Sequence, residues 1–421
     1  MGKASRARWD GNVRSMAIVA KDPADVTAED IAFLRANYTS TGGLLPNAYA
    51  GGAFYTPTHV ARVIMEALRG LSGGSFPPAS RFLEPSAGSG VFIEHLPVDA
   101  EITALELDET SAKVMSLIYP QADVIQGDAF LHGRRDYYDY VIGNPPYGVS
   151  IDVAATDLPD AFDTLRITKG KDGTSRAKGK SELAFIELAI KATKPGGYIA
   201  FVLPKGIGYG TQSAKIREIM RETCWHIASI ELPAETFALT GTTIKTDIHI
   251  LRKVTPNARM VFVKYVEVAG AYHRVEQTDE AQADTFWHEG QPPVLHAQIN
   301  DIGYDKDGRY TDKWGDGLTQ LDELVEAFEN DLMRENTDPV APFDGVERTG
   351  GLTHAFNVKI PPYEAWREKA GQMAYWNVLT LGRGEEIAVR GGTAESSFDF
   401  TWQDRIVDAY YAPSYEERAA A

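Results

Sequence analysis

The sequence predicts a doubly wound α/β fold built on a largely parallel sheet. From about residue 56 to residue 253, short apolar runs typical of buried strands alternate with segments whose apolar residues recur at helical spacing. Such alternation favours parallel strands joined by crossover helices. Ligands of these sheets bind beyond the carboxyl ends of the strands, and the most unusual turns of this sequence fall there.

The expected elements follow one another in chain order. Thr56 can cap a helix that has Pro57 at its first position and apolar residues at helical spacing over 59–68. Seven strands are expected, over residues 81–83, 102–107, 123–125, 140–142, 198–203, 227–231 and 247–251. Further helices are expected after the glycine-rich turn that follows the first strand, and over residues 109–118, 181–193 and 214–221.

Composition narrows the class of protein. A chain of 421 residues with 43% hydrophobic and 24% charged residues is typical of a soluble globular protein with more than one domain. Cys224 is the only cysteine, so the chain offers neither a disulfide framework nor a thiolate zinc site, and no metal is expected. No apolar run approaches the roughly 20 residues of a membrane span. The first residues lack the apolar core of a signal peptide, so a cytoplasmic location is expected.

A stiff turn interrupts the strand pattern at DYVIGNPPYGVS, residues 139–150. Pro145 and Pro146 have fixed φ angles and no N–H groups for a sheet, and each is preceded by a residue that the proline forces toward extended geometry. Asn144 and Tyr147 flank the two prolines. The oxygen of the Asn144 side chain and the carbonyl of Pro145 can accept both hydrogens of an exocyclic amine, while Tyr147 stacks on the ring that carries it. The lone pair of the amine then faces an electrophile, and no strong general base is needed.

A glycine-rich turn, FLEPSAGSG at residues 82–90, follows the first strand. Gly88 and Gly90 allow the backbone to approach a ligand closely, and a following helix would offer free N–H groups, although many such turns bind nothing. No Gly-Lys-Ser/Thr follows, which excludes a phosphate-binding P-loop. Glu84 would repel phosphate and suits a ligand that carries an amine.

Acidic residues end the next two strands. Glu106 is placed to accept hydrogen bonds from ribose hydroxyls, although it and Asp108 can equally be charges at a helix N-terminus. Asp128 can accept from an adenine amino group or serve only as a turn aspartate. Together with the glycine-rich turn, these acids favour a nucleoside ligand without phosphates.

These motifs resemble those of S-adenosylmethionine-dependent amino-methyltransferases, particularly the N6-adenine DNA methyltransferases of gamma order. Residues 53–68 are similar to the first cofactor motif, 82–96 to the glycine motif and 143–148 to the catalytic motif, while 180–204 and 231–251 are similar to later motifs. Residues 31–148 also resemble the methylase portion of large phage and plasmid methylase–helicase proteins. The resemblance implies a seven-stranded, Rossmann-like sheet with an antiparallel last strand.

The resemblance also implies roles for individual residues. The methionine end of S-adenosylmethionine would be held by residues of the first two motifs, namely Tyr55, Thr56, Pro57, Glu84, Pro85, Ser86 and Gly88. Glu106 would hold the ribose and Asp128 the adenine of the cofactor, with Asn144 close to both ligands. A target adenine, flipped out of the DNA duplex, would be held by the catalytic residues Asn144, Pro145, Pro146 and Tyr147. Phe237 would support that base from the other side, unless it is a core phenylalanine.

The expected domains are a flexible N-terminal segment over residues 1–30, a methyltransferase domain over 31–270 and a C-terminal region over 271–421. Members of this family commonly read DNA through a basic domain, whereas the C-terminal region is acidic and gives little indication of its chemistry. The net charge of −17 also disfavours phosphate contacts. DNA binding is therefore expected from a basic segment or from a partner, such as a restriction or specificity subunit.

The basic segment spans residues 166–180 and carries six cations against a single acid, Asp172. It is either a mobile, solvated loop or a phosphate-binding surface, and its position directly after the catalytic turn favours binding. The residues predicted to contact DNA are Lys169, Lys171, Arg176 and Lys178. Three alternatives stay open for the whole protein: a protein-glutamine methyltransferase, a ribosomal RNA amino-methyltransferase, and a DNA mimic or scaffold without catalysis.

Overall fold

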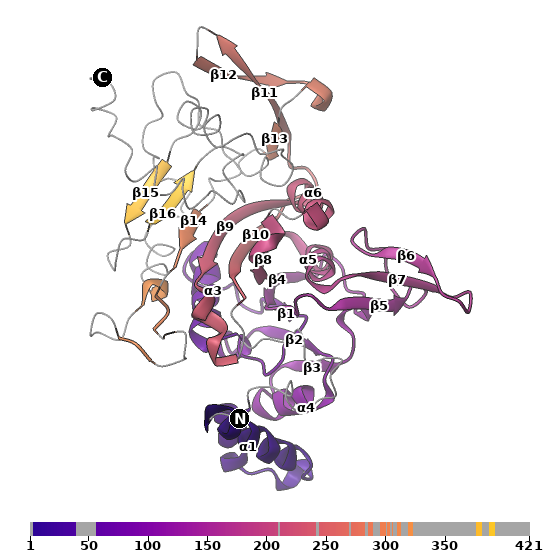
Figure 1. Cartoon of the computed structure of the whole chain (residues 1–421), viewed down its shortest axis with the longest axis vertical. Helices are drawn as coiled ribbons and strands as arrows, with labels where there is room; N and C mark the ends of the chain where they lie inside the picture. The colour runs from indigo at the N-terminus through magenta and orange to yellow at the C-terminus, as the bar shows by residue number, and fades with distance from the viewer. Residues whose placement is uncertain are drawn as a thin grey trace. The chain divides into compact units, whose positions relative to one another are not determined.

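The computed structural model describes residues 3–38, 56–208, 211–240, 244–268 and 271–282, short stretches between 285 and 322, and residues 376–380 and 387–391 (Figure 1). The chain forms two compact units. One consists of Met1–Met65, Ser75–Leu203 and Phe237–Thr242, and the other of Glu66–Gly74, Pro204–Thr236 and Thr243–Ala421. All predicted site residues belong to the first unit, although Tyr55 lies outside the described residues.

The first unit is built on five parallel strands in the order β3-β2-β1-β4-β8. Their bounds are β1 Arg81–Glu84, β2 Glu101–Glu106, β3 Asp123–Gln126, β4 Tyr138–Gly143 and β8 Thr193–Pro204. Leu83 of β1 pairs with Thr103 on one side and with Val141 on the other, and it is fully buried. The strand order reverses between β1 and β4, and open α/β sheets bind ligands at such a switch point.

Amphipathic helices cover this sheet because their apolar residues recur at helical spacing. They are α3 Thr58–Leu71, α4 Glu109–Ile118 and α5 Ser181–Ala192. In α4 the buried positions include Val114, Met115 and Ile118, while α5 is buried along almost its whole length. None of the described helices is long and apolar enough to cross a membrane.

The N-terminal segment, expected to be flexible over residues 1–30, contains helices. Helix α1 spans Lys3–Val19 and α2 spans Ala28–Asn37, and both pack against α4. A capping box between Thr27 and Asp30 fixes the start of α2. Leu34 is fully buried in a cluster shared with α4, and Tyr38 hydrogen-bonds Ser111 at 2.6 Å between hydroxyl oxygens. These contacts attach the helices to α4.

The second unit contains helix α6 Ala214–Thr223 and the antiparallel pair of strands β9 Cys224–Leu232 and β10 Thr246–Lys253. Strand β14 Leu295–Gln298 pairs with β9 in parallel, and β16 Ile387–Gly391 and β15 Trp376–Thr380 follow in antiparallel order. A separate sheet contains β11 Met260–Val268, β12 Ala271–Gln277 and β13 Thr285–His288. The boundary expected after residue 270 falls between β11 and β12, which pair with each other.

The main sheet has the order β15-β16-β14-β9-β10-β8-β4-β1-β2-β3. The predicted architecture corresponds to seven neighbouring strands of this sheet, in the order β9-β10-β8-β4-β1-β2-β3. These strands are mostly parallel, and β10 is antiparallel to its neighbour β9. The predicted fold class is confirmed. Beyond it, the C-terminal region adds three strands that the sequence did not predict.

Two further local structures differ from the prediction. The helix expected after the glycine-rich turn is only a 3-10 helix over Ile93–His95. Two hydrogen bonds of the same i to i+3 kind precede it, from the N–H of Gly90 to the carbonyl of Ala87 and from the N–H of Ile93 to the carbonyl of Gly90. Residues 150–180 contain a three-stranded antiparallel sheet of β5 Ser150–Ala154, β7 Ser175–Lys180 and β6 Arg166–Lys169, in that order. The basic segment is thus strand structure and not a mobile loop.

Candidate active site

The predicted site residues lie at the carboxyl ends of four neighbouring parallel strands. Glu84 is the last residue of β1 and Glu106 the last of β2. Asp128 follows β3, and Asn144 follows β4 directly. The acids and the catalytic turn therefore meet at one edge of the sheet, around its switch point.

Hydrogen bonds attach the glycine-rich turn to the end of β2. The N–H of Ala87 donates to the carbonyl of Leu105 at 2.9 Å, and the N–H of Gly88 donates to Oε2 of Glu106 at 2.7 Å. Gly88 has a φ of 56°, which favours glycine. Gly90 serves packing, because a Cβ there would lie 2.8 Å from the Tyr119 ring. Gly90 therefore has a packing role, and the approach of a ligand to its backbone stays a prediction.

Glu84 is a buried acid that has no neutralising partner among the described residues. It is 3% exposed, and within the described residues neither its Oε2 atom nor the buried Oγ of Ser86 has a hydrogen-bond partner. Burial, and secondarily the charge of Glu106, raises the pKa of Glu84 well above its usual value. Two buried polar atoms without partners on this turn fit a polar ligand with a cationic group.

Glu106 is held by the backbone on both sides. Its Oε2 accepts from Gly88, and its Oε1 accepts from the N–H of Asp108 at 2.8 Å. Burial raises its pKa, while these hydrogen bonds act in the opposite direction. A carboxylate has about four acceptor positions, so Glu106 can still accept from a diol. Asp108 accepts from the N–H and the hydroxyl of Ser111, both at 2.8 Å, and this confirms its role as the cap of α4.

Asp128 caps the short 3-10 helix Ala129–Leu131, since its Oδ1 accepts from the N–H of Phe130 at 3.0 Å. The turn interpretation of Asp128 is thus confirmed, and a contact to adenine stays a prediction. Sequence reasoning missed two large apolar side chains beside these acids, Leu107 at 50% and Leu131 at 48% exposure. For Leu107, the sequence signal was its position between Glu106 and Asp108, directly after the strand.

The catalytic turn begins beside the glycine-rich turn. A Cβ on Gly143 would lie 3.8 Å from Cγ of Glu84 and from Cδ of Pro85, so the two turns are in close proximity. The hydroxyl of Tyr147 donates to Oδ1 of Asn144 and also contacts the carbonyl of Val202 at 3.0 Å. Tyr147 is 5% exposed, and burial raises its pKa well above the usual value. Its ring thus offers little surface in this state, and stacking on a target base stays a prediction.

Two residues that sequence reasoning missed hold the catalytic turn from the start of α5. The hydroxyl of Ser181 donates to the carbonyl of Pro146 at 2.7 Å, and the N–H of Val149 donates to that hydroxyl at 3.2 Å. Oε2 of Glu182 accepts from the N–H of Gly148 at 3.0 Å. In the described part of the chain no donor bonds the carbonyl of Pro145, so it keeps its acceptor capacity.

The remaining predicted residues are placed as follows. Thr56 is 7% exposed and Pro57 half-buried, directly before α3, where the carbonyl of Pro57 accepts from the N–H of Ala61 at 3.1 Å. Phe237 is fully buried in the 3-10 segment Ala234–Thr240, a position that favours the core alternative.

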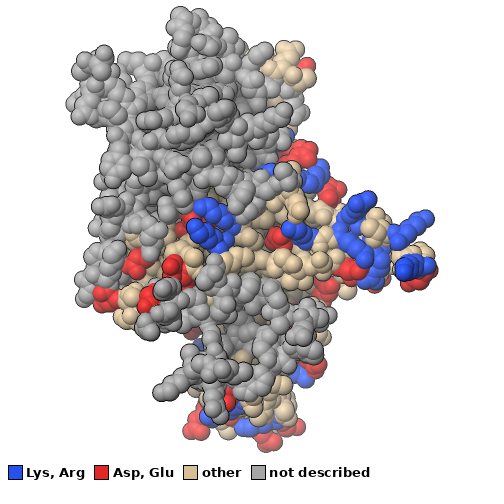
Figure 2. Space-filling model, in the orientation of Figure 1, with Lys and Arg blue, Asp and Glu red and all other residues tan. Residues whose placement is uncertain are grey.

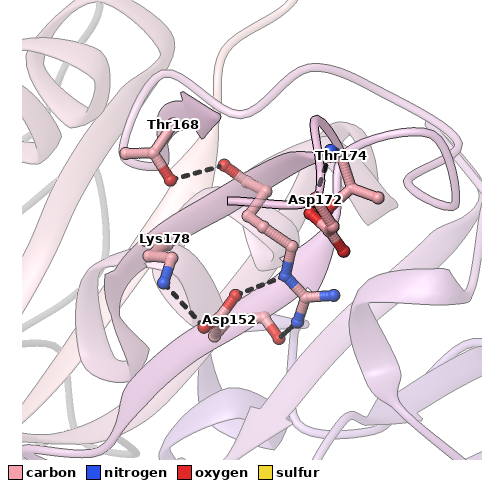
Figure 3. A network of polar contacts seen from close by, with 6 residues as sticks. Asp152, Thr168, Asp172, Thr174 and Lys178 are labelled. Atoms are coloured by element: carbon pink, nitrogen blue, oxygen red, sulfur yellow. Dashed lines mark hydrogen bonds and ion pairs between the residues drawn. The ribbon is translucent and has the colours of Figure 1, made fainter. Parts of the chain in front are cut away.

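The four residues predicted to contact DNA lie on the small sheet of β5, β6 and β7, where Lys and Arg side chains gather (Figure 2). Lys169 and Lys171 are exposed. Arg176 and Lys178 both pair with Asp152, at 2.7 Å and 2.8 Å, as the dashed lines around Asp152 indicate (Figure 3). The structure therefore separates the predicted set into two pairs with different surroundings.

A family model described as N-6 DNA Methylase matches residues 46–286, which include every predicted site residue. The chain belongs to this family. Family membership implies S-adenosylmethionine as the cofactor, in agreement with the sequence prediction.

Individual relatives match parts of the chain. The chain is 29% identical over 257 residues to the Defense against restriction protein B of Escherichia phage P1, covering 59% of this chain and 10% of that protein. It is 30% identical over 179 residues to the Modification methylase CviBIII of Paramecium bursaria Chlorella virus NC1A, covering 40% and 42%. The matched regions thus span less than half of each of these relatives.

Among solved structures, the chain is similar to a type I restriction-modification methyltransferase subunit from Streptococcus thermophilus. The TM-score is 0.46 at 19% identity, and the match covers 69% of this chain and 55% of that one.

Proposed function

We propose that this member of the N-6 DNA Methylase family transfers a methyl group from S-adenosylmethionine to the N6 amine of adenine in DNA. The observation that carries the proposal is the proximity of two turns. Gly143 directly precedes the rigid Asn-Pro-Pro-Tyr turn. A Cβ built on Gly143 would lie 3.8 Å from Cγ of Glu84, the buried acid of the glycine-rich turn. A site for a planar amine thus adjoins a site for a cationic nucleoside.

The residues present fit the cofactor. S-adenosylmethionine supplies a methyl group on a sulfonium, which needs no help from a metal to leave. Glu84 and Ser86 offer buried atoms without partners to its amino-acid end, beside the Thr56 and Pro57 segment. Glu106 accepts the ribose hydroxyls with the capacity that its two backbone contacts leave, and Asp128 lies where the adenine amine is expected. Leu107 provides an exposed apolar surface for the adenine ring.

The catalytic turn orients the target amine. Asn144 and the carbonyl of Pro145 accept its two hydrogens, so the nitrogen lone pair points toward the methyl donor. Ser181 and Glu182 fix the following backbone through Pro146 and Gly148, and this keeps the two acceptors in place. Tyr147 holds Asn144 through its hydroxyl and supplies the aromatic surface once the base enters.

The proposed substrate is duplex DNA, with the target adenine flipped out of the stack so that its N6 atom can be reached. Phe237 supports that base only if its core position opens. A restriction or specificity subunit is the partner that we propose for sequence recognition, since the chain as a whole is acidic, with a net charge of −17.

The proposal is tested by incubating the protein with cofactor labelled in its methyl group and with unmethylated DNA, RNA and protein in parallel. Label in DNA is expected, recovered as N6-methyladenine after digestion to nucleosides. Label confined to protein would favour glutamine methylation, and label confined to RNA would favour guanine or adenine amines in ribosomal RNA. Cofactor binding without transfer to any of the three would favour the scaffold alternative.

A further inference from the structure

The small sheet that follows the catalytic turn has one charged face and one packed face. Directly opposed residues in an antiparallel pair point to the same side, and successive residues alternate. The pairs Asp152↔Lys178, Lys178↔Arg166 and Ser150↔Lys180 therefore share one face. That face carries four cations, Arg166, Arg176, Lys178 and Lys180, and the single acid Asp152. The sequence SRAKGK of β7 follows this alternation, with a cation at every second position.

Along β7, the opposite face is held against the protein, although Ile167 of β6 on that side is 58% exposed. Ala177 is fully buried there, and a Cβ on Gly179 would lie 2.7 Å from Cδ2 of Leu165. The chain before β6 is in turn bound to α5. Glu187 accepts from the N–H of Asp163 at 2.9 Å and from the N–H of Thr164 at 2.8 Å. The orientation of the sheet is therefore fixed, and its cationic face is directed away from these contacts.

Asp152 separates the cations of this face into two groups. Arg176 donates to Oδ1 and to the carbonyl of Asp152, at 2.7 Å and 2.6 Å, while Lys178 pairs with Oδ2 at 2.8 Å. Hydrogen bonds from Lys178 and then Arg176 lower the pKa of Asp152, so it stays ionised. Arg166 and Lys180 lie on the same face and are exposed, and no ion pair or hydrogen bond of their side chains occurs within the described residues.

The hairpin tip between β6 and β7 adds two exposed lysines. Asp172 accepts from the N–H and the hydroxyl of Thr174, at 3.1 Å and 2.7 Å, and so orders the tip. Lys169 is the last residue of β6, where the alternation directs it to the side opposite Arg166, and Lys171 lies within the turn. Like Arg166 and Lys180, both are exposed and make no ion pair within the described part of the chain. Besides Asp152 and Asp172, acidic residues lie in the connection between β5 and β6. Of these, Asp160 pairs with Arg135, while Asp157 and Asp163 are exposed.

Both ends of the sheet are joined to the catalytic turn. Strand β5 begins three residues after Tyr147, and β7 ends at Lys180, the residue before Ser181. Ser181 itself bonds the carbonyl of Pro146 and the backbone of Val149. A ligand held on the cationic face is thereby held at a fixed position relative to Asn144.

We propose that this face and the adjoining end of the β6–β7 hairpin form a clamp for the phosphate backbone of duplex DNA, and that Arg166 and Lys180 on the face and Lys169 and Lys171 at the hairpin end make the phosphate contacts. Arg176 and Lys178, held by Asp152, are positioning residues that maintain the face. The inference rests on the proposed function and adds to it the surface that sets the substrate against the catalytic turn. Its partner is duplex DNA because a cationic sheet on a protein of net charge −17 concentrates attraction for a polyanion on this sheet.

The test measures the affinity for a fluorescent DNA duplex at four or more salt concentrations. A variant with Arg166→Gln, Lys169→Gln, Lys171→Gln and Lys180→Gln should bind more weakly by at least about tenfold at low salt. Its log–log dependence on salt should be shallower by about 3 to 4, because each phosphate contact contributes about 0.9 to the slope. Unchanged affinity for S-adenosylmethionine in calorimetry shows that the variant is folded.

A matched pair of variants controls for net charge. Lys169→Gln with Lys171→Gln should lower the slope by about 2, since two contacts are lost. Lys113→Gln with Lys215→Gln removes the same charge from α4 and α6, where both lysines are more than half exposed, and should leave the slope unchanged. Equal slopes for all proteins, or an equal loss in the control pair, would overturn the clamp while leaving DNA methylation intact. If the wild type itself neither binds nor methylates DNA, the proposed function fails together with the clamp.

Discussion

The isosteric substitution Glu84→Gln should uncouple cofactor binding from proton release. Glu84 is 3% exposed, lies near Glu106 and has a pKa raised well above its usual value by burial, so the free protein favours the protonated form of this side chain. The ammonium group of the cofactor favours the ionised carboxylate. Binding should therefore release a proton from the wild type, and none from Glu84→Gln.

The expected loss of affinity follows from the contact that is removed. A charge-assisted hydrogen bond in a buried site contributes about 1.5–3 kcal/mol, which corresponds to roughly 10- to 150-fold in the dissociation constant. Glutamine keeps the shape of the side chain, which matters because Gly143 and Pro85 pack closely around it. The amide cannot neutralise the ammonium, so most of that contribution should be lost.

Isothermal titration calorimetry at pH 6 in two buffers of different ionisation enthalpy measures both the affinity for the cofactor and the number of protons released on binding. At this pH the α-amino group of the ligand is already protonated, since such groups titrate near 7.7–8.0. S-adenosylhomocysteine and methylthioadenosine form a matched pair of ligands, because only the first carries the amino-acid end. The Glu84→Gln substitution should weaken the binding of S-adenosylhomocysteine and leave the affinity for methylthioadenosine unchanged.

Equal affinity of wild type and Glu84→Gln for S-adenosylhomocysteine would refute the assignment of Glu84 to the amine. The same conclusion would follow if the binding enthalpy of the wild type were the same in both buffers, since no proton would then be released. Equal losses for both ligands would instead indicate that the glutamine disturbs the turn as a whole.

Three further predictions concern the same region and the second unit. Glu106→Ala should weaken cofactor binding in calorimetry by about 1.5–3 kcal/mol. It should also lower the melting temperature, because the N–H groups of Gly88 and Asp108 lose their acceptor. Unchanged affinity would exclude Glu106 as the ribose ligand. Ser181→Ala removes two hydrogen bonds from the catalytic turn and should reduce the methylation rate about tenfold with cofactor affinity intact; a full rate would show that the turn is rigid without it. Burial, and then the charge of Glu231, raises the pKa of Asp247 to about 8, so the folded protein keeps a proton that the unfolded chain loses near pH 4, and stability should fall as pH rises from about 4 to 8. Asp247→Asn should flatten this dependence in thermal unfolding, and parallel curves for the two proteins would contradict the assignment.

The strands and the ends that carry the site were predictable because the parallel sheet is buried on both faces. Continuous apolar runs such as Tyr140–Ile142 have few alternatives to a strand, and the residues that follow them must lie at the sheet edge. The helix Glu109–Ile118 was predicted with the bounds that the structure has, since Asp108 caps it. The acids at strand ends are thus visible in sequence.

Other features depend on contacts that no local pattern shows. The sheet of β5, β6 and β7 has cations where a half-buried strand would have apolar residues, so the alternation in SRAKGK was interpreted as a loop. The role of Ser181 requires knowledge that the catalytic turn returns to the start of α5, 35 residues after Pro146. The packing function of Gly90 depends on Tyr119, which is distant in sequence.

The most direct test of the central claim compares wild type with Asn144→Ala on unmethylated duplex DNA, with digestion to nucleosides and mass spectrometry. The wild type should produce N6-methyladenine, and Asn144→Ala should produce none while binding the cofactor with nearly unchanged affinity, because the lost oxygen orients only the target amine. A variant that keeps more than a few per cent of the activity would contradict the catalytic assignment. A wild-type product other than N6-methyladenine would contradict the proposed reaction itself.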